Sequence, residues 1–352
     1  MARDEPVRDF WSAAPRVRTL EGVPPDAIPF ADLLDAGQPV LLKGVARHWP
    51  LVQAGLSSPE AAMDYLKRFD AGLPLTVFVG EPEIEGRFFY EEGAAALNFQ
   101  SGRAPLAAIL DRIASHLGDD APPSVYVGST DVPTFFPRLG EENDLGLDEA
   151  LIGGNPPIAS LWIGNRTTAS AHYDLSNNIA CCLVGRRRFT LFPPDQVHNL
   201  YPGPLEPTPG GQVVSMVDFR EPDLDSFPRF AEAIKAAQVA EMKPGDALFY
   251  PAMWWHHVEA LDPFNVLLNY WWSRAPAFLD TPQTTLLHAW LSLRDRPEPE
   301  KRAWRELFEY YVFGPADRAG AHLPEAARGS LAPMDAMRAR RLRATLLNRL
   351  NR

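Results

Sequence analysis

The sequence predicts a mainly β fold with flanking helices: a double-stranded β-helix, or jelly-roll, followed by a C-terminal helical region. From about Pro123 the chain becomes a series of short strand-like segments separated by turns rich in proline and glycine. A mixed region precedes this series, and helix-like segments follow it. We therefore expect a mixed α/β segment flanking the barrel (1–122), a jelly-roll core (123–281) and a helical region (282–352).

Composition limits the class of protein. The chain has 352 residues, of which 46% are hydrophobic, enough for a sizeable core. Its net charge of −11 argues against a general nucleic-acid binder, although a local basic groove remains open. The start is charged, and no apolar run approaches the length of about eighteen residues that a membrane span needs. We expect a cytoplasmic protein that does not enter a membrane.

The first region alternates helix-like and strand-like segments. The stretch "PFADLLDAG" predicts a short helix that ends at Gly37, and 59–69 predicts a second helix with proline in its first turn. Residues 104–118 have the spacing of an amphipathic helix. The strand-like stretches between these helices are "PVLLKGV", "LPLTVFVG" and "GRFFY".

The central region contains the strands of the predicted barrel. They are "SVYVGS", "ASLWIG", "NIACCLV", "RRFTLFP", "DALFYP", "HHVEAL" and "FNVLLNYWWS". The clearest unit is "KPGDALFYP", in which Pro-Gly-Asp supplies a turn before a strand. Cys181 and Cys182 are adjacent, so on a strand they point to opposite faces and do not indicate a disulfide framework.

The last region predicts three helices, in "TTLLHAWLSLRD", "EKRAWRELFEYYVFG" and "DAMRARRLRATLLNRLN". Leu342, Leu346, Leu347 and Leu350 recur at helical spacing in the last of them. Apolar helices after a finished barrel need a surface to cover, which is either the barrel or a second copy of the chain. We interpret the arginines between these leucines as a solvated face.

A candidate metal site begins with His172 and Asp174 in "TTASAHYDLSNN". Side chains two residues apart on a strand share a face, so both can reach one ion. Among the 8 histidines, His256 and His257 stand out because they follow "PAMWW" after the Pro-Gly-Asp strand, which a jelly-roll places opposite the strand of His172. Two imidazoles and one carboxylate form the facial triad of non-haem Fe(II) sites, which leaves positions open for oxygen chemistry.

These segments resemble a known family. The run from "SLWIGNRTTASAHYDLSNN" to "LYPGP", then "PGDALFYPAMWWHHVEAL" and "LLNYWW", is similar to the JmjC/cupin-like Fe(II) and 2-oxoglutarate-dependent oxygenases. The resemblance is specific over 160–273 and weaker over 86–100. It is nearest to the asparaginyl hydroxylase branch that modifies hypoxia-inducible factor, with its bacterial relatives. The resemblance implies that His172, Asp174 and His256 hold the iron and that His257 points away.

The resemblance also implies a cosubstrate pocket. Asn178 and Asn269 match polar residues that line it, Tyr126 matches a tyrosine that donates to the cosubstrate carboxylate, and Trp271 matches an aromatic residue beside the metal. The closest relatives carry a lysine where this chain has Arg187. Strand alternation puts that arginine on the face opposite its two neighbours, and we expect it inside, on the distal carboxylate of 2-oxoglutarate.

A second departure concerns a hydroxyl group. Three residues before His172, where the closest relative has a hydroxyl, this chain has Ala169. Either a donor to the cosubstrate is absent or Thr168 supplies it.

The expected function is oxygenation of a C–H bond with Fe(II), 2-oxoglutarate and O2, giving succinate and CO2. The resemblance favours hydroxylation of a protein or peptide side chain, with Phe89, Tyr90 and Glu91 either at the entrance or packed on the surface. It also favours a homodimer through the C-terminal helices. Alternatives are a tRNA-base or small-molecule hydroxylase, a cupin enzyme without 2-oxoglutarate, and a non-catalytic peptide-binding module. With 2 cysteines there is no Cys-rich reader module, which argues against a histone-demethylase assembly.

Overall fold

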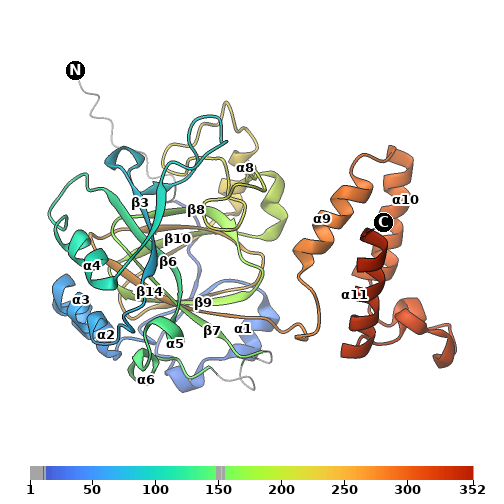
Figure 1. Cartoon of the computed structure of the whole chain (residues 1–352), viewed down its shortest axis with the longest axis horizontal. Coiled ribbons are helices and arrows are strands. Elements are labelled where there is room, and N and C mark those ends of the chain that lie inside the picture. Colours follow the sequence, from blue (N-terminus) through green and yellow to red (C-terminus); the bar gives the residue numbers. More distant parts are fainter. Residues whose placement is uncertain (1–10, 12, 148–151, 153–154, 352) are drawn as a thin grey trace. The chain divides into compact units, whose positions relative to one another are not determined.

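The computed structural model describes residues 11, 13–147, 152 and 155–351. These residues form two compact units, one that extends to Arg274 and one at Ala275–Arg352. The first unit contains the two β-sheets, and the second is helical (Figure 1). The finer three-part division expected from the sequence stays a prediction.

Two sheets form the frame of the first unit. The larger sheet runs in the order β1 (Arg18–Leu20), β2 (Val40–Leu42), β12 (Ala247–Tyr250), β9 (Asn177–Val184), β14 (Asn265–Trp272), β7 (Ile158–Gly164), β6 (Ser124–Asp131), β3 (Leu75–Gly80) and β5 (Gln100–Ala104). The smaller sheet runs in the order β11 (Gln238–Met242), β10 (Arg187–Phe192), β13 (Trp255–Ala260), β8 (Thr168–Tyr173) and β4 (Arg87–Phe88). The predicted mainly β jelly-roll fold with helices is confirmed.

Strands from the first 122 residues complete both sheets. β1 and β2 extend the larger sheet at one end, β3 and β5 extend it at the other, and β4 adds to the smaller sheet. The edge strand β5 has the sequence "QSGRA" and pairs with β3 alone, which suits a strand whose side chains are mostly exposed.

Helices cover the larger sheet. They are α1 (Phe30–Ala36), α2 (Pro50–Ser57), α3 (Pro59–Lys67), α4 (Leu106–Ala114), α5 (Val132–Phe135) and α6 (Leu139–Glu142). The helix α8 (Phe230–Ala236) instead packs with Phe192, Val239 and Trp255 of the smaller sheet. As predicted, α1 ends at Gly37, which has the left-handed φ of 59° that glycine tolerates. Gly55 brings α2 close to β9, because a Cβ there would lie 2.8 Å from a methyl group of Val184. Figure 1 shows α2, α3 and α4 together on one side of the unit.

Side-chain alternation on β9 separates two apolar cores. Ile179, Cys181 and Leu183 belong to the core under the helices. Ala180 and Cys182 belong to the core that also contains Phe189 and Leu191 of β10 and so fills the space between the sheets. Both cysteines are buried free thiols on opposite faces, as the sequence predicts. The interior of the jelly-roll is therefore lined by every second residue of β9 and β10.

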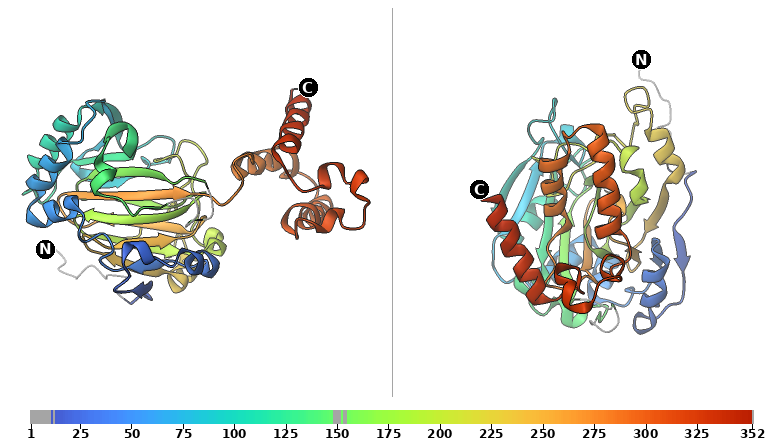
Figure 2. Two further views of the ribbon diagram at one scale, coloured as in Figure 1. Left: turned by 90° about the horizontal axis from the view of Figure 1, so that it is seen from below. Right: turned by 90° about the vertical axis from the view of Figure 1, so that its right-hand side faces the viewer.

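The second unit contains α9 (Pro282–Leu293), α10 (Glu298–Phe308), a π-helical turn (Glu309–Phe313) and α11 (Ala336–Leu350) (Figure 2). None of the described residues of α9, α10 and α11 is buried. Large apolar side chains are exposed on them, among them Leu286, Leu287, Trp290, Leu291, Trp304, Leu307, Leu346 and Leu347. No helix in the described part of the chain combines the length and apolar character that a bilayer crossing needs.

Candidate metal centre

Neighbouring strands of the smaller sheet bring two histidines together. β8 and β13 pair antiparallel, and His256 lies directly across from His172. Their ring centroids are 4.3 Å apart. From the sequence we expected the strand of His256 to lie opposite the strand of His172 in the jelly-roll. The structure instead makes β8 and β13 neighbours in one sheet, so cross-strand pairing sets the distance between the two histidines.

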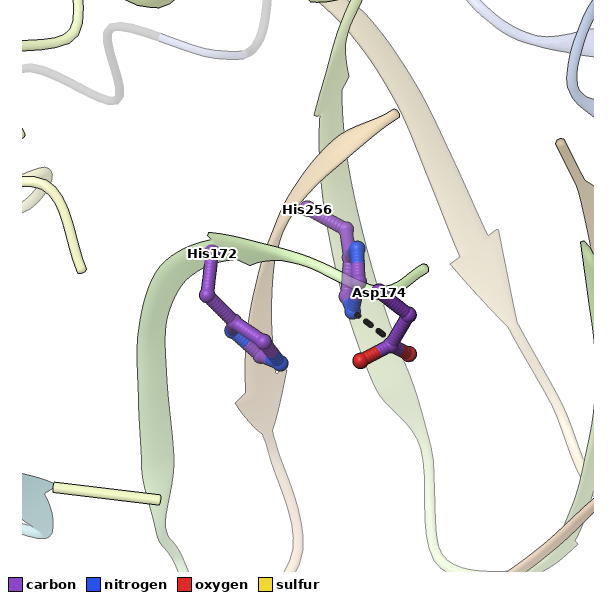
Figure 3. A group of neighbouring side chains, drawn as sticks. All are labelled: His172, Asp174 and His256. Atoms are coloured by element: carbon purple, nitrogen blue, oxygen red, sulfur yellow. Dashed lines mark ion pairs between the residues drawn. The ribbon is translucent and has the colours of Figure 1, made fainter. Parts of the chain in front are cut away.

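Asp174 completes a group of three. It follows β8 by one residue, so the chain has left the strand when it presents this carboxylate. One ligand atom from each of His172, Asp174 and His256 lies within 4.8 Å of the others, and Figure 3 shows the three side chains converging. The Nε2 of His256 is 3.7 Å from Oδ2 of Asp174.

Backbone carbonyl groups orient both imidazoles. Nδ1 of His172 lies 2.8 Å from the carbonyl oxygen of Ser170, and Nδ1 of His256 lies 3.0 Å from that of Trp254. A carbonyl oxygen only accepts, so each Nδ1 donates and each Nε2 keeps its lone pair. Burial, followed by the neighbouring His172, lowers the pKa of His256 to about 4. At neutral pH the imidazole is therefore uncharged, and its Nε2 lone pair is available to a metal ion.

A hydrogen-bonded chain holds Asp174. Its Oδ2 accepts from Nε1 of Trp271 at 3.0 Å and from Nδ2 of Asn178 at 3.2 Å. The Oδ1 of Asn178 accepts from Asn269 at 3.2 Å, and Oδ1 of Asn269 accepts from Nε1 of Trp162 at 2.7 Å. These two donors fix the orientation of the carboxylate beside the histidines.

All the site residues predicted from the sequence line one cavity of about 670 Å³. They are Tyr126, His172, Asp174, Asn178, Arg187, His256, Asn269 and Trp271. His257 faces away and stacks on Phe219, with ring centroids 4.4 Å apart. The cavity wall includes Phe88, whereas Phe89 and Tyr90 lie at a separate surface pocket and pack with Val214. Of the two alternatives left open for Phe89 and Tyr90, the structure favours packing at the surface.

Arg187 enters the cavity from a tight turn. Gly185 has a φ of 70°, and a Cβ there would lie 2.3 Å from Oδ1 of Asn265, so the β9–β10 connection requires glycine. Arg186 is exposed and pairs with Asp262, while Arg187 points inward and is 3% exposed. Its Nε and Nη2 are buried and have no hydrogen-bond partner among the described residues.

The surroundings of Arg187 suit an anion. Burial lowers the pKa of Arg187, although a guanidinium group stays charged at neutral pH. Burial raises the pKa of Tyr126 to about 12, so its phenol stays protonated and can donate. A buried cation with unused donors is costly unless a ligand carries the matching charge. The guanidinium and the phenol together fit a carboxylate.

Thr168 and Ala169 both line the same cavity. The Thr168 hydroxyl accepts from Nη2 of Arg220 at 3.1 Å, which leaves its own hydrogen to donate. Thr168 is therefore able to supply the donor that Ala169 lacks, and its contact with a cosubstrate stays a prediction.

Sequence reasoning missed several aromatic rings of the cavity wall. Trp162, Phe88 and Phe99 all line it. Alternation along β7 was a usable signal, because Leu161 and Ile163 are in the core under the helices and Trp162 must face the other way. No comparable signal marks Phe99, which lies in a connection between strands.

The donor set fits Fe(II). It offers two imidazole nitrogens and one carboxylate oxygen on one side of an open cavity, the ligand types of the facial triad. The unpartnered guanidinium of Arg187 fits a dicarboxylate whose other end reaches the metal.

Comparisons with known proteins agree with this geometry. A family model described as "Cupin-like domain" matches residues 25–278. "HSPB1-associated protein 1" of Homo sapiens is 37% identical over 121 residues, which cover 34% of this chain and 24% of that protein. "Lysine-specific demethylase JMJ31" of Arabidopsis thaliana is 31% identical over 128 residues, covering 35% and 23%. "Lysine-specific demethylase 8" of Xenopus tropicalis is 25% identical over 279 residues, covering 76% and 54%.

The chain spans about a quarter of the length of the first two of these relatives and about half of the third. The family model, in contrast, covers well over half of this chain. The nearness to the asparaginyl hydroxylase branch expected from the sequence stays a prediction. The protein belongs to the cupin-like domain family, whose Jumonji C members are oxygenases that use Fe(II) and 2-oxoglutarate.

Proposed function

We propose that this protein is an Fe(II)- and 2-oxoglutarate-dependent oxygenase that hydroxylates a C–H bond of a protein or peptide side chain. The observation that carries the proposal is the convergence of His172, Asp174 and His256 in a cavity that also contains the unpartnered guanidinium of Arg187. The family includes proteins without enzymatic activity, but a complete ligand set and an unused anion anchor favour catalysis.

In this proposal His172 and His256 would hold the iron through Nε2, and Asp174 would hold it through a carboxylate oxygen. Arg187 and Tyr126 hold the distal carboxylate of 2-oxoglutarate and fix its orientation. Iron with 2-oxoglutarate supplies the oxidising power for C–H hydroxylation from O2, with succinate and CO2 as co-products. The protein's contributions are the fixed carboxylate of Asp174, the two oriented imidazoles and the cavity that would hold the cosubstrate.

The anion anchor argues against a cupin enzyme that uses no 2-oxoglutarate. A site without 2-oxoglutarate would leave the guanidinium of Arg187, which is 3% exposed and has unused donors, without a balancing anion. A non-catalytic peptide-binding module would likewise not need the hydrogen bonds that orient the Asp174 carboxylate towards the two histidines.

A protein partner is supported by the name of a relative and by the second unit. One relative is named for its association with another protein, HSPB1. The C-terminal helices carry exposed apolar residues such as Leu291, which is 80% exposed. So many large apolar side chains exposed on neighbouring helices are typical of an interaction site. We propose that it joins two copies of the chain, and that the homodimer works in the cytoplasm.

The test of the activity is product analysis. The protein is incubated in air with Fe(II), 2-oxoglutarate and a peptide library prepared from a proteome, with His172→Ala as the control. We expect succinate and peptides that gain the mass of one oxygen atom, both absent in the control. A parallel incubation with tRNA is digested to nucleosides. Oxygenated nucleosides without oxygenated peptides would replace the protein substrate by RNA, and absence of succinate would remove the activity.

A further inference from the structure

A wall of packed rings borders the part of the cavity beyond the metal-binding groups. Phe88 stacks on Tyr126 with centroids 5.7 Å apart, and Tyr126 stacks on Trp162 at 6.0 Å. Trp271 meets Trp162 edge-on at 5.7 Å, and Phe99 meets Phe88 edge-on at 5.1 Å. Each ring is thus engaged by a neighbour, and the five form a continuous wall.

The rings of this wall pack on one another. A quaternary or protonated amine is attracted by the open face of an aromatic ring, and cages for such groups surround the cation with separate faces. Here each of the five rings is already in contact with a neighbouring ring, and Tyr126 is stacked with both Phe88 and Trp162. An apolar wall of mutually packed rings favours contact with an uncharged group.

Charge in the cavity leads to the same conclusion. Among the described residues that line it, Asp174 is the one carboxylate and Arg187 is the one permanent cation. Asp174 is held by Trp271 and Asn178 beside the two histidines, so it is not available to a substrate. When Fe(II) and doubly charged 2-oxoglutarate are bound, the positive charges of the iron and Arg187 equal the negative charges of Asp174 and 2-oxoglutarate. No negative charge then remains to balance a substrate cation.

We infer that the substrate region of this cavity takes an uncharged, largely apolar group and excludes cationic side chains, methylated lysine included. The inference rests on the proposed function, because it assumes that substrate approaches the metal along this wall. An unpaired cation loses its hydration on entry and gains no partner. An apolar group of the same shape gains contact with the rings of Phe88, Phe99 and Trp162.

A pair of small molecules tests this directly. Choline and 3,3-dimethylbutan-1-ol have nearly the same shape, and the first carries a trimethylammonium where the second carries a tert-butyl group. The full chain is loaded with Mn(II), which is paramagnetic and replaces Fe(II) without oxygen chemistry, and with 2-oxoglutarate. The relaxation of the methyl protons of each probe is then measured by NMR over a range of concentrations.

We expect the alcohol to show enhanced relaxation and choline to bind at least about tenfold more weakly, as burial of an unpaired charge requires. Equal binding, tighter binding of choline, or no enhancement for either probe would overturn the inference. Water-proton relaxation in the same sample reports Mn(II) binding. Loss of that signal would contradict the proposed metal site, whereas a bound metal with a preference for choline would contradict the substrate inference alone.

A gain-of-function variant tests the cause. Ser129 is exposed, lines the cavity and donates to Oγ of Ser160 at 3.1 Å. Ser129→Glu places a carboxylate at this wall, and Ser129→Gln places an uncharged group of the same size there. We expect the glutamate variant to bind choline at least about fivefold more tightly than the glutamine variant. Equal affinity of the two variants for choline would mean that missing negative charge is not what excludes the cation.

Discussion

Replacement of Arg187 by methionine separates the two roles of its charge. The side chain is 3% exposed, and its Nε and Nη2 have no partner among the described residues. Without ligand, the buried charge is a cost that methionine removes, so we expect the free energy of unfolding to rise by about 1 kcal/mol. With 2-oxoglutarate, truncation of one partner of a buried charge pair costs about 3 kcal/mol, which corresponds to a loss of about a hundredfold in affinity.

Calorimetry and thermal unfolding measure both effects. Titration of 2-oxoglutarate into the Mn(II)-loaded protein gives the affinity, and unfolding without ligand gives the stability. Arg186→Met is the matched control, because Arg186 lies one residue away, is exposed and pairs with Asp262. We expect the control to keep its affinity for 2-oxoglutarate. If Arg187→Met binds 2-oxoglutarate as the parent does, the residue has no part in the cosubstrate site and the reasoning from its unused donors is refuted.

Three further predictions concern the metal, the turn and the second unit. Trp271→Phe removes a donor to Asp174, so we expect Fe(II) affinity to fall about tenfold; unchanged affinity would rule out that role. Hydrogen bonds from Arg186 lower the pKa of Asp262 below its ordinary value, so Asp262→Asn should cost about 1 kcal/mol of stability at neutral pH. That difference should vanish as pH falls through the lowered value, because the folded state then loses its advantage in holding the carboxylate ionised; a constant difference would contradict it. Deleting residues 335–352 should convert a dimer, with twice the 39.1 kDa mass of the chain, to a monomer in light scattering; an unchanged mass would contradict the proposed interface.

Strands that are buried in the sheet were predictable, because a buried strand needs a run of apolar residues and such a run is visible in the sequence. "NIACCLV" and "FNVLLNYWWS" fall within β9 and β14 or overlap them closely. β5 was not predictable, because "QSGRA" is polar and is recruited only by its pairing with β3. Tertiary pairing decided its conformation, and a single sequence does not contain that information.

The candidate site divides in the same way. Arg187 is set apart from its neighbours by local alternation, so its placement follows from short-range geometry. Asp174 lies one residue beyond β8, so alternation along the strand did not by itself place its carboxylate. The contact between Trp271 and Asp174 joins β14 to the end of β8, strands of different sheets. The aromatic wall likewise combines rings from four strands and a connection. Such long-range contacts depend on how the sheets pack.

The most direct test of the central claim is anaerobic titration of the Fe(II)-loaded protein with 2-oxoglutarate, followed by visible absorption. Chelation of iron by the cosubstrate produces a weak metal-to-ligand charge-transfer band. We predict that the band appears in the parent protein, is lost in His172→Ala and requires a much higher concentration of 2-oxoglutarate in Arg187→Met. Iron bound without a band at any concentration of 2-oxoglutarate would contradict the account.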